Sequence, residues 1–215
     1  MSHVTIVETP DLTDKRRAFV LRGGAFMATA AVSSGGISAP ARAAPFPVLF
    51  NSRQQRVIPD LAVAANMAAL EAPPSRFRET GGAGLLHAVQ GYVNACRYRP
   101  ETRSEDFAAP WRLPGAFLRE GGDCRDFAVA KYLLLRCFGL AHHDLRLVLL
   151  DLSLPRRPRP QRRTQTVLAV NLGGKVGILD NFHGHVLPHE RMLECRPLWS
   201  LNRHGLWRHL GYGRG

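Results

Sequence analysis

The sequence of 215 residues predicts an α+β domain, with helices early in the chain and an antiparallel sheet after them. Three early segments are expected to be helical: 61–70 is rich in alanine, 85–96 has apolar residues at helical spacing, and 124–138 is apolar on most sides. Short apolar segments of strand length follow later: 145–152, 166–172 and 175–182. With 45% hydrophobic and 21% charged residues, the composition is that of a globular protein and excludes wholesale disorder.

The segment 124–138 is expected to be a central helix, because it is apolar on most of its sides. Asp123 is its expected N-cap, and Gly139 ends it. Between the last two strands, Gly173-Gly174 predicts a two-residue hairpin turn. Residues whose numbers sum to 347 then face each other, which puts Gln165 and Asp180 on the same face of the sheet, one diagonal step apart.

Residues 1–43 have the features of an export signal. A charged region with the pair Arg16-Arg17 leads into a weakly apolar stretch that closes on Ala41-Arg42-Ala43. The arginine pair resembles the twin-arginine type, so we expect an exported, periplasmic protein with one mature domain over 44–215. An internal amphipathic helix is the alternative. The oxidising periplasm permits disulfides among the four cysteines. The sequence contains no C-x-x-C pair, which argues against a structural zinc site.

The net charge of +12 first suggests a nucleic-acid partner, but the residues behind it argue otherwise. Only three of the 29 basic residues are lysines, which favours a compositional bias towards arginine. The densest group of arginines, over 156–163, lacks the interleaved aromatics of a single-strand binder. It indicates either a solvated loop or a docking site for an acidic protein segment, an anionic lipid or a nucleic acid, and we favour an acidic partner among these. No apolar run reaches the length of a membrane span.

Cys124 is the expected nucleophile. It follows two glycines, begins the central helix and neighbours Arg125, and both a helix N-terminus and a cation stabilise a thiolate. The glycines allow a substrate backbone to approach closely, and the amide of Cys124 is placed to stabilise an oxyanion. An ordinary buried cysteine is the alternative.

A longer motif surrounds this cysteine, and its parts extend from about His87 to Trp207. The parts are Trp111 with Pro114 and Phe117, the run Gly121–Tyr132, Val167-Leu168, Leu179–Asn181, Trp199–Asn202 and Gly205–Trp207. Together they resemble the bacterial transglutaminase-like cysteine proteinases, whose LapG-type members are exported proteases. The resemblance implies a papain-like core with Cys124 as nucleophile and Asp180 as the orienting carboxylate. The expected binding residues are Asp123, Arg125, Trp111 and Gly122.

Two positions depart from the family pattern. The resemblance implies a histidine two residues before Val167, and this chain has Gln165 there. It also implies a glutamate that binds calcium together with Asp123, and this chain has Arg125 there. A guanidinium in place of an oxygen ligand weakens or abolishes a Ca²⁺ site. We therefore expect a peptidase homologue that cleaves or binds protein substrates with impaired catalysis, or a non-catalytic periplasmic binding protein on the same fold.

Other histidines offer alternatives. Strand parity places His183 on the face opposite Asp180, and His185 lies beyond the expected end of the strand. The sequence His142-His143-Asp144, with His87 and Asp180 as further ligands, suggests a metal-dependent phosphohydrolase. A turn between helix and strand is the expectation that we favour for it.

Overall fold

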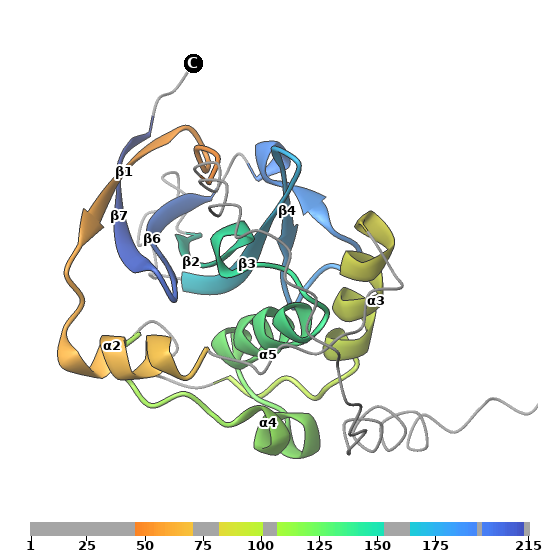
Figure 1. Cartoon of the computed structure of the whole chain (residues 1–215). Helices are drawn as coiled ribbons and strands as arrows, with labels where there is room; N and C mark the ends of the chain where they lie inside the picture. The colour runs from red at the N-terminus through yellow and green to blue at the C-terminus, as the bar shows by residue number, and fades with distance from the viewer. Residues whose placement is uncertain (1–45, 71–81, 101–106, 153–163, 193–194, 213–215) are drawn as a thin grey trace, which may run out of the picture. The chain divides into compact units, whose positions relative to one another are not determined.

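The computed structural model describes residues 46–70, 82–100, 107–152, 164–192 and 195–212 (Figure 1). These residues belong to one unit of the chain, Arg42–Gly215. The expected export signal, over 1–43, and the arginine group over 156–163 lie outside the described residues, so both remain predictions from the sequence.

The described residues contain four α-helices: α2 (Leu61–Ala68), α3 (Ala83–Asn94), α4 (Pro114–Glu120) and α5 (Cys124–Cys137). Helices α2, α3 and α5 confirm the expected helical segments. Helix α4 was not expected from the sequence; it is a short helix that begins with Pro114 at its first position and is followed by Gly121, whose φ is +82°. Asp123 caps α5 as expected, because its side chain accepts hydrogen bonds from the amides of Arg125 and Asp126.

The strands form one antiparallel sheet in the order β1-β7-β6-β2-β3-β4-β5 (Figure 1). Their bounds are β1 Ser52–Val57, β2 Leu145–Asp151, β3 Thr164–Leu172, β4 Lys175–Leu179, β5 Leu187–Pro188, β6 Arg196–Asn202 and β7 Gly205–Tyr212. The α+β fold class is therefore confirmed. Neither the edge strand β1 nor its partner β7 was expected from the sequence.

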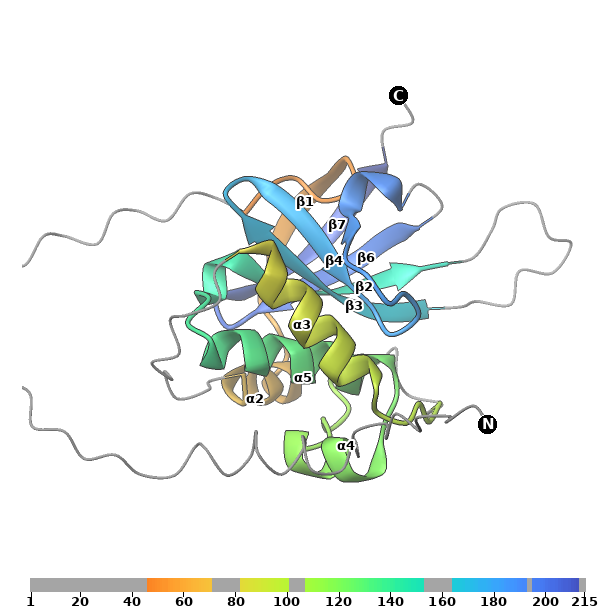
Figure 2. The same ribbon diagram turned by 90° about the vertical axis from the view of Figure 1, so that its right-hand side faces the viewer.

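Helix α5 packs against β3 and β2, with α3 and α4 beside it (Figures 1 and 2). Strand β3 alternates between two apolar clusters, as its pleat requires. Leu168 and Val170 join the cluster that contains the apolar residues of α5, whereas Val167 and Ala169 join a second cluster on the other face. Both faces of β3 are thus buried, and the strand fixes the position of α5 over the sheet.

The β3–β4 hairpin has the register that the sequence predicts. Leu172 pairs with Lys175, and Leu168 pairs with Leu179, so facing residues sum to 347. Strand β4 nevertheless ends at Leu179, before the expected end at residue 182. The reason is local: the side chain of Asp180 accepts hydrogen bonds from the amides of Phe182 and His183, which turns the chain out of the sheet.

The central strand β2 carries a buried arginine, Arg146. The guanidinium of Arg146, on β2, lies 4.6 Å from the ring of Phe46 and 3.9 Å from that of Trp207, on β7. It also donates a hydrogen bond to Gln54 of β1. Burial lowers the pKa of Arg146 to about 10. Arg146 thereby ties β1 and β7 to the centre of the sheet.

His209 of β7 is buried between two serines. Its Nδ1 lies 2.6 Å from the hydroxyl of Ser52, and its Nε2 lies 2.9 Å from that of Ser200. A hydroxyl can donate or accept, so a neutral imidazole is satisfied at both nitrogens. Burial, with a smaller effect from Arg146, lowers the pKa of His209 to about 4.

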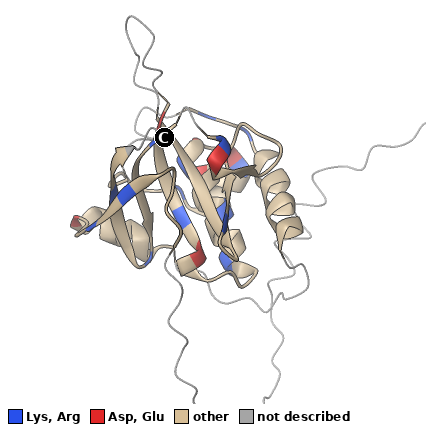
Figure 3. Cartoon of the chain, turned by 90° about the horizontal axis from the view of Figure 1, so that it is seen from above, with Lys and Arg blue, Asp and Glu red and all other residues tan. Residues whose placement is uncertain are grey.

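The described part of the chain bears on two earlier expectations, that no segment spans a membrane and that the positive charge does not mark a nucleic-acid site. No helix there is both long and apolar enough to cross a membrane. Lys and Arg lie on several different strands and helices of the ribbon rather than on one element (Figure 3).

Acid conditions are expected to destabilise the fold through His209. Its pKa is about 4 in the folded chain and about 6.5 when exposed, so the unfolded chain alone takes up the proton between these values. The stabilisation is complete above pH 6.5 and is lost as the pH falls towards 4, by at most about 1.4 kcal/mol per pH unit. Urea unfolding across this range should show a shallower loss for His209→Gln. Equal slopes in both proteins would contradict this assignment.

Candidate active site

Cys124 is the first residue of α5 and lies against the start of β3. Its side chain is buried, and the backbone amide of Thr166 donates a hydrogen bond to its Sγ at 3.4 Å. The helix N-terminus and this amide both favour a negative charge on the sulfur. Gln165 directly precedes Thr166, so the position at which the family resemblance implies a histidine lies beside the thiol.

A reciprocal capping box fixes the start of α5. Asp123 Oδ1 accepts hydrogen bonds from the amides of Arg125 and Asp126, at 2.9 and 3.1 Å. Asp126 Oδ2 in turn accepts a hydrogen bond from the amide of Asp123 at 3.1 Å. Arg112 donates to the same carboxylate of Asp126. The box sets the backbone on both sides of Cys124, so the direction of the thiol is determined by buried groups.

Asp123 and Arg125 are both buried, although the sequence analysis proposed them as binding residues. A guanidinium nitrogen of Arg125 lies 3.9 Å from Asp123 Oδ2. Burial raises the pKa of the Asp123 carboxyl group, while the hydrogen bond from Asp126 and the charge of Arg125 oppose that shift. In this structure the two side chains are buried and face each other rather than an open groove.

Gly121 and Gly122 make room for the protein's own chain. A Cβ on Gly121 would overlap the carbonyl of Arg97, and one on Gly122 would stand 2.8 Å from the Cβ and Cγ of Asp126. Gly122 also pairs with the segment around Tyr98, through hydrogen bonds to Arg97 and Arg99. The expected reason for these glycines was the approach of a substrate backbone, whereas the structure shows internal close packing.

Gln165 and Asp180 do not meet as directly as the sequence suggested. Gln165 Nε2 donates to the side chain of Asn181 at 3.3 Å, whereas Asp180 Oδ2 lies 2.6 Å from Nδ1 of His183. The prediction that His183 faces away from Asp180 was wrong. Parity holds only within a strand, and the chain leaves β4 at Asp180. The pattern Asp-x-x-His after a strand is the signal that was missed, since an aspartate commonly caps such a turn.

Buried Lys131 of α5 anchors this turn. Its Nζ donates to the backbone carbonyl of Asp180 at 2.5 Å and to Asn94 Oδ1 at 2.7 Å, and Asn94 also donates to the same carbonyl. Burial lowers the pKa of Lys131 to about 7, although the charge of Asp180 opposes the shift. The sequence analysis quoted Lys131 only as part of the motif and gave it no role.

Two partly exposed aromatic rings border the same region. The ring of Phe182, which follows Asn181, lies 6.4 Å from that of Tyr98. The start of β3, the turn after β4 and the first turn of α5 lie together, on the right in Figure 2. Trp111, the remaining expected binding residue, is half-buried and packs on the apolar cluster around α5. Its indole nitrogen has no acceptor among the described residues.

Other candidate features lie apart from the thiol. His142–Asp144 forms the expected turn between α5 and β2, and His142 lies 2.9 Å from the hydroxyl of Tyr132. No group of metal-ligating side chains occurs in the part of the chain that the structure describes.

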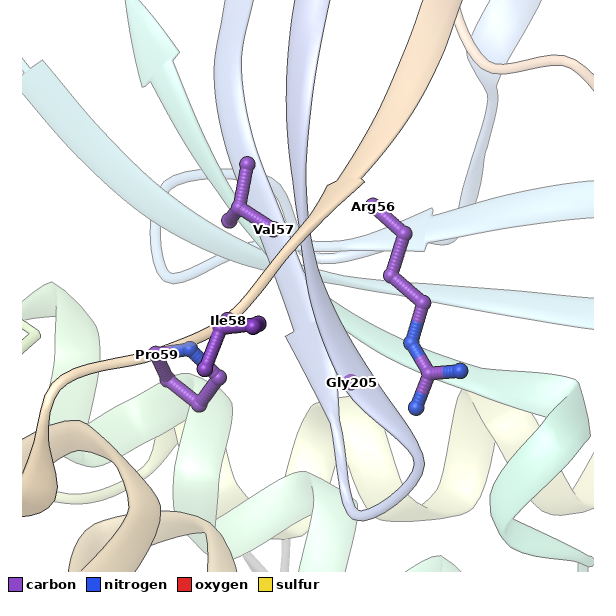
Figure 4. A pocket seen from close by; sticks show the side chains of 5 residues that line it. All are labelled: Arg56, Val57, Ile58, Pro59 and Gly205. Carbon is purple, nitrogen blue, oxygen red and sulfur yellow. The ribbon is translucent and has the colours of Figure 1, made fainter.

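A surface hollow of about 360 Å³ lies between β1 and the β6–β7 turn (Figure 4). All four cysteines are thiols.

Gly122→Ala is expected to destabilise the fold by about 1–3 kcal/mol, because the new methyl group overlaps Asp126 and strains the capping box. Gly91→Ala is the matched control. Gly91 lies exposed within α3 with open space around it, so alanine there should stabilise by about 0.5–1 kcal/mol. Urea unfolding measures both, and a Gly122→Ala protein as stable as the wild type would show that the contact yields freely.

No protein-family model and no curated protein matches the chain. Solved structures of LapG from Legionella pneumophila are similar to it. One is 24% identical, with a TM-score of 0.51 over 68% of this chain and 76% of that chain. A calcium-bound form is 26% identical, with a TM-score of 0.52 and coverages of 72% and 78%. An EGTA-treated form gives 25%, 0.51, 68% and 74%. The chain therefore has the transglutaminase-like fold that its sequence predicted.

Proposed function

We propose that this chain is an exported cysteine peptidase homologue that acts on protein segments with impaired catalysis. Cys124 is its nucleophile. Asp180 corresponds to the carboxylate that orients the histidine in the transglutaminase-like proteinases that the sequence resembles. One observation carries the proposal: the thiol of Cys124 lies against the amide of Thr166, beside Gln165. The fold shared with LapG supports it.

The impairment follows from the chemistry of residue 165. An amide side chain hydrogen-bonds a thiol or a carbonyl, but it does not accept and return a proton at neutral pH. Loss of a general base typically lowers the rate by about 10²–10⁴-fold. The amide of Gln165 is also engaged with Asn181, which holds it in a structural contact.

The substrate or partner is a protein segment, and acidic segments suit it best. The chain carries 29 basic and 17 acidic residues, and the arginine group over 156–163 directly precedes β3 in sequence. The proposal includes export through the signal over 1–43 and a periplasmic location.

The alternative is a non-catalytic periplasmic binding protein on the same fold. The pairing of Gln165 with Asn181 favours it, because the amide is held in a structural contact and residue 165 supplies no proton acceptor. This alternative predicts capture of a protein partner that Cys124→Ala leaves unchanged, whereas a peptidase loses turnover with that substitution.

Calcium does not fit the residues around Asp123. Ca²⁺ needs six to eight oxygen ligands, and Asp123 Oδ1 already accepts two backbone amides. Its Oδ2 faces the guanidinium of Arg125 at 3.9 Å, a cation where a second cation would have to bind. LapG has been solved in a calcium-bound form, and we infer that this chain instead keeps its arrangement at Asp123 without the ion.

Gln165→His is expected to restore proton transfer and to raise hydrolysis of fluorescein-labelled casein by at least about tenfold. The increase should disappear when Cys124→Ala is added, which serves as the control for contaminating proteases. Brisk hydrolysis by the unaltered protein, lost on Cys124→Ala alone, would show that catalysis is not impaired.

Calcium is expected to leave the stability unchanged. The midpoint of thermal unfolding should be the same in ~1 mM Ca²⁺ and in excess EGTA, because an ion stabilises the fold only if it binds the folded state. A midpoint that rises with calcium concentration would contradict the assignment of Arg125.

A further inference from the structure

The turn after β4 contains a histidine–carboxylate pair, His183 with Asp180, that the family pattern does not include. We propose that His183, oriented by Asp180, is the proton acceptor for Cys124 in place of residue 165. This inference rests on the proposed role of Cys124 as nucleophile. It gives the impaired site a slower route to its thiolate instead of none.

The pairing of His183 with Asp180 has the geometry of an oriented base. His183 Nδ1 lies 2.6 Å from Asp180 Oδ2, and the carboxylate is buried whereas 47% of the histidine side chain is exposed. A carboxylate oxygen accepts, so Nδ1 donates and the lone pair of the neutral ring lies on Nε2. A carboxylate that fixes the tautomer in this way is the second half of a cysteine–histidine–acid arrangement.

Several hydrogen bonds hold the backbone of the turn that carries Asp180 and His183. Asp180 Oδ1 accepts the amides of Phe182 and His183, and the backbone carbonyl of Asp180 accepts the ammonium of Lys131. The backbone carbonyl of His183 accepts side-chain amides of α3, from Gln90 at 2.7 Å and Asn94 at 2.9 Å. These contacts hold the backbone of the turn that carries the imidazole ring.

Two contacts place the turn beside Cys124. The side chain of Asn181, which follows Asp180, accepts a hydrogen bond from Gln165. Gln165 is next to Thr166, whose backbone amide donates to the Sγ of Cys124. Phe182 lies against Tyr98, which pairs with Gly122, two residues before the cysteine. His183 follows directly in the chain, so these contacts place its backbone in the neighbourhood of the thiol. A general base works within hydrogen-bond reach of the proton or through one water molecule, and apo geometry alone does not exclude it.

The proton transfers balance without any further reactant. The S–H bond of Cys124 breaks, its proton moves to His183 Nε2, and the electron pair stays on sulfur, which attacks the carbonyl carbon of the peptide bond. The imidazolium then gives its proton to the leaving amine, and water releases the acyl group from the sulfur with the neutral imidazole again as acceptor.

The groups that face His183 define its electrostatic surroundings. Asp180 is the anion in contact with it, and His185 lies next to it with its ring centre at 6.0 Å. Lys131 contributes the cation from α5, through the carbonyl of Asp180. From α3 the contacts are the neutral amides of Gln90 and Asn94.

Alkylation of Cys124 by iodoacetamide, followed by peptide mass spectrometry from pH 5 to 9, tests the inference without a substrate. His183→Ala should lower the rate at pH 7 by about tenfold and move the profile towards that of an ordinary thiol. His185→Ala is the matched control and should stay within about twofold. His183→Asn keeps a donor for Asp180 but has no acceptor corresponding to Nε2, so it should behave like His183→Ala.

Each other result overturns the inference. A wild-type profile in His183→Ala, an equal loss in His185→Ala, or recovery by His183→Asn would assign His183 a structural role at most. The proposed function fails separately: casein hydrolysis absent even in Gln165→His would refute the peptidase while leaving the alkylation result intact. Hydrolysis that needs Cys124 but not His183 would keep the peptidase and remove this base.

Discussion

The ammonium group of Lys131 is the contact on which the site depends. It joins α5 to α3 through Asn94 and to the end of β4 through the carbonyl of Asp180. The side chain is fully buried, and this burial lowers the pKa of Lys131 to about 7. Because the same helix begins with Cys124, one rigid element carries both the thiol and the anchor of the turn that bears Asp180.

Buried polar contacts, rather than an apolar pocket, define the position of each reactive group. The capping box of Asp123 and Asp126 sets the first turn of α5, and the amide of Thr166 contacts the sulfur. Asp180 satisfies two amides of its own turn before it contacts His183. Buried hydrogen bonds of this kind favour one arrangement, because breaking them leaves a buried polar group without that partner. The arrangement therefore persists whether or not residue 165 can accept a proton.

The sequence predicted the features that depend on local patterns and missed those that depend on where strands end. Periodicity located α2, α3 and α5, and Gly173-Gly174 set the register of β3 and β4. Parity failed at His183 because it assumed a strand that the side chain of Asp180 terminates. The reason for Gly122 was equally hidden, since only the folded chain brings Asp126 against it. Strand β1 was missed because it is a polar edge strand, whose partner β7 lies at the other end of the domain.

The pairing of β1 with β7 has a consequence for how the protein is made. Ser52 pairs with Tyr212 and Val57 with Leu206, so the sheet joins segments about 150 residues apart in the chain. Arg146 on the central strand β2 needs Trp207 from the last strand to cover its guanidinium. A nascent chain in which β7 has not yet emerged leaves β1 without a neighbour and Arg146 without this ring. The sheet is thus completed only once β7 is available, and until then the edge of β6 stays exposed.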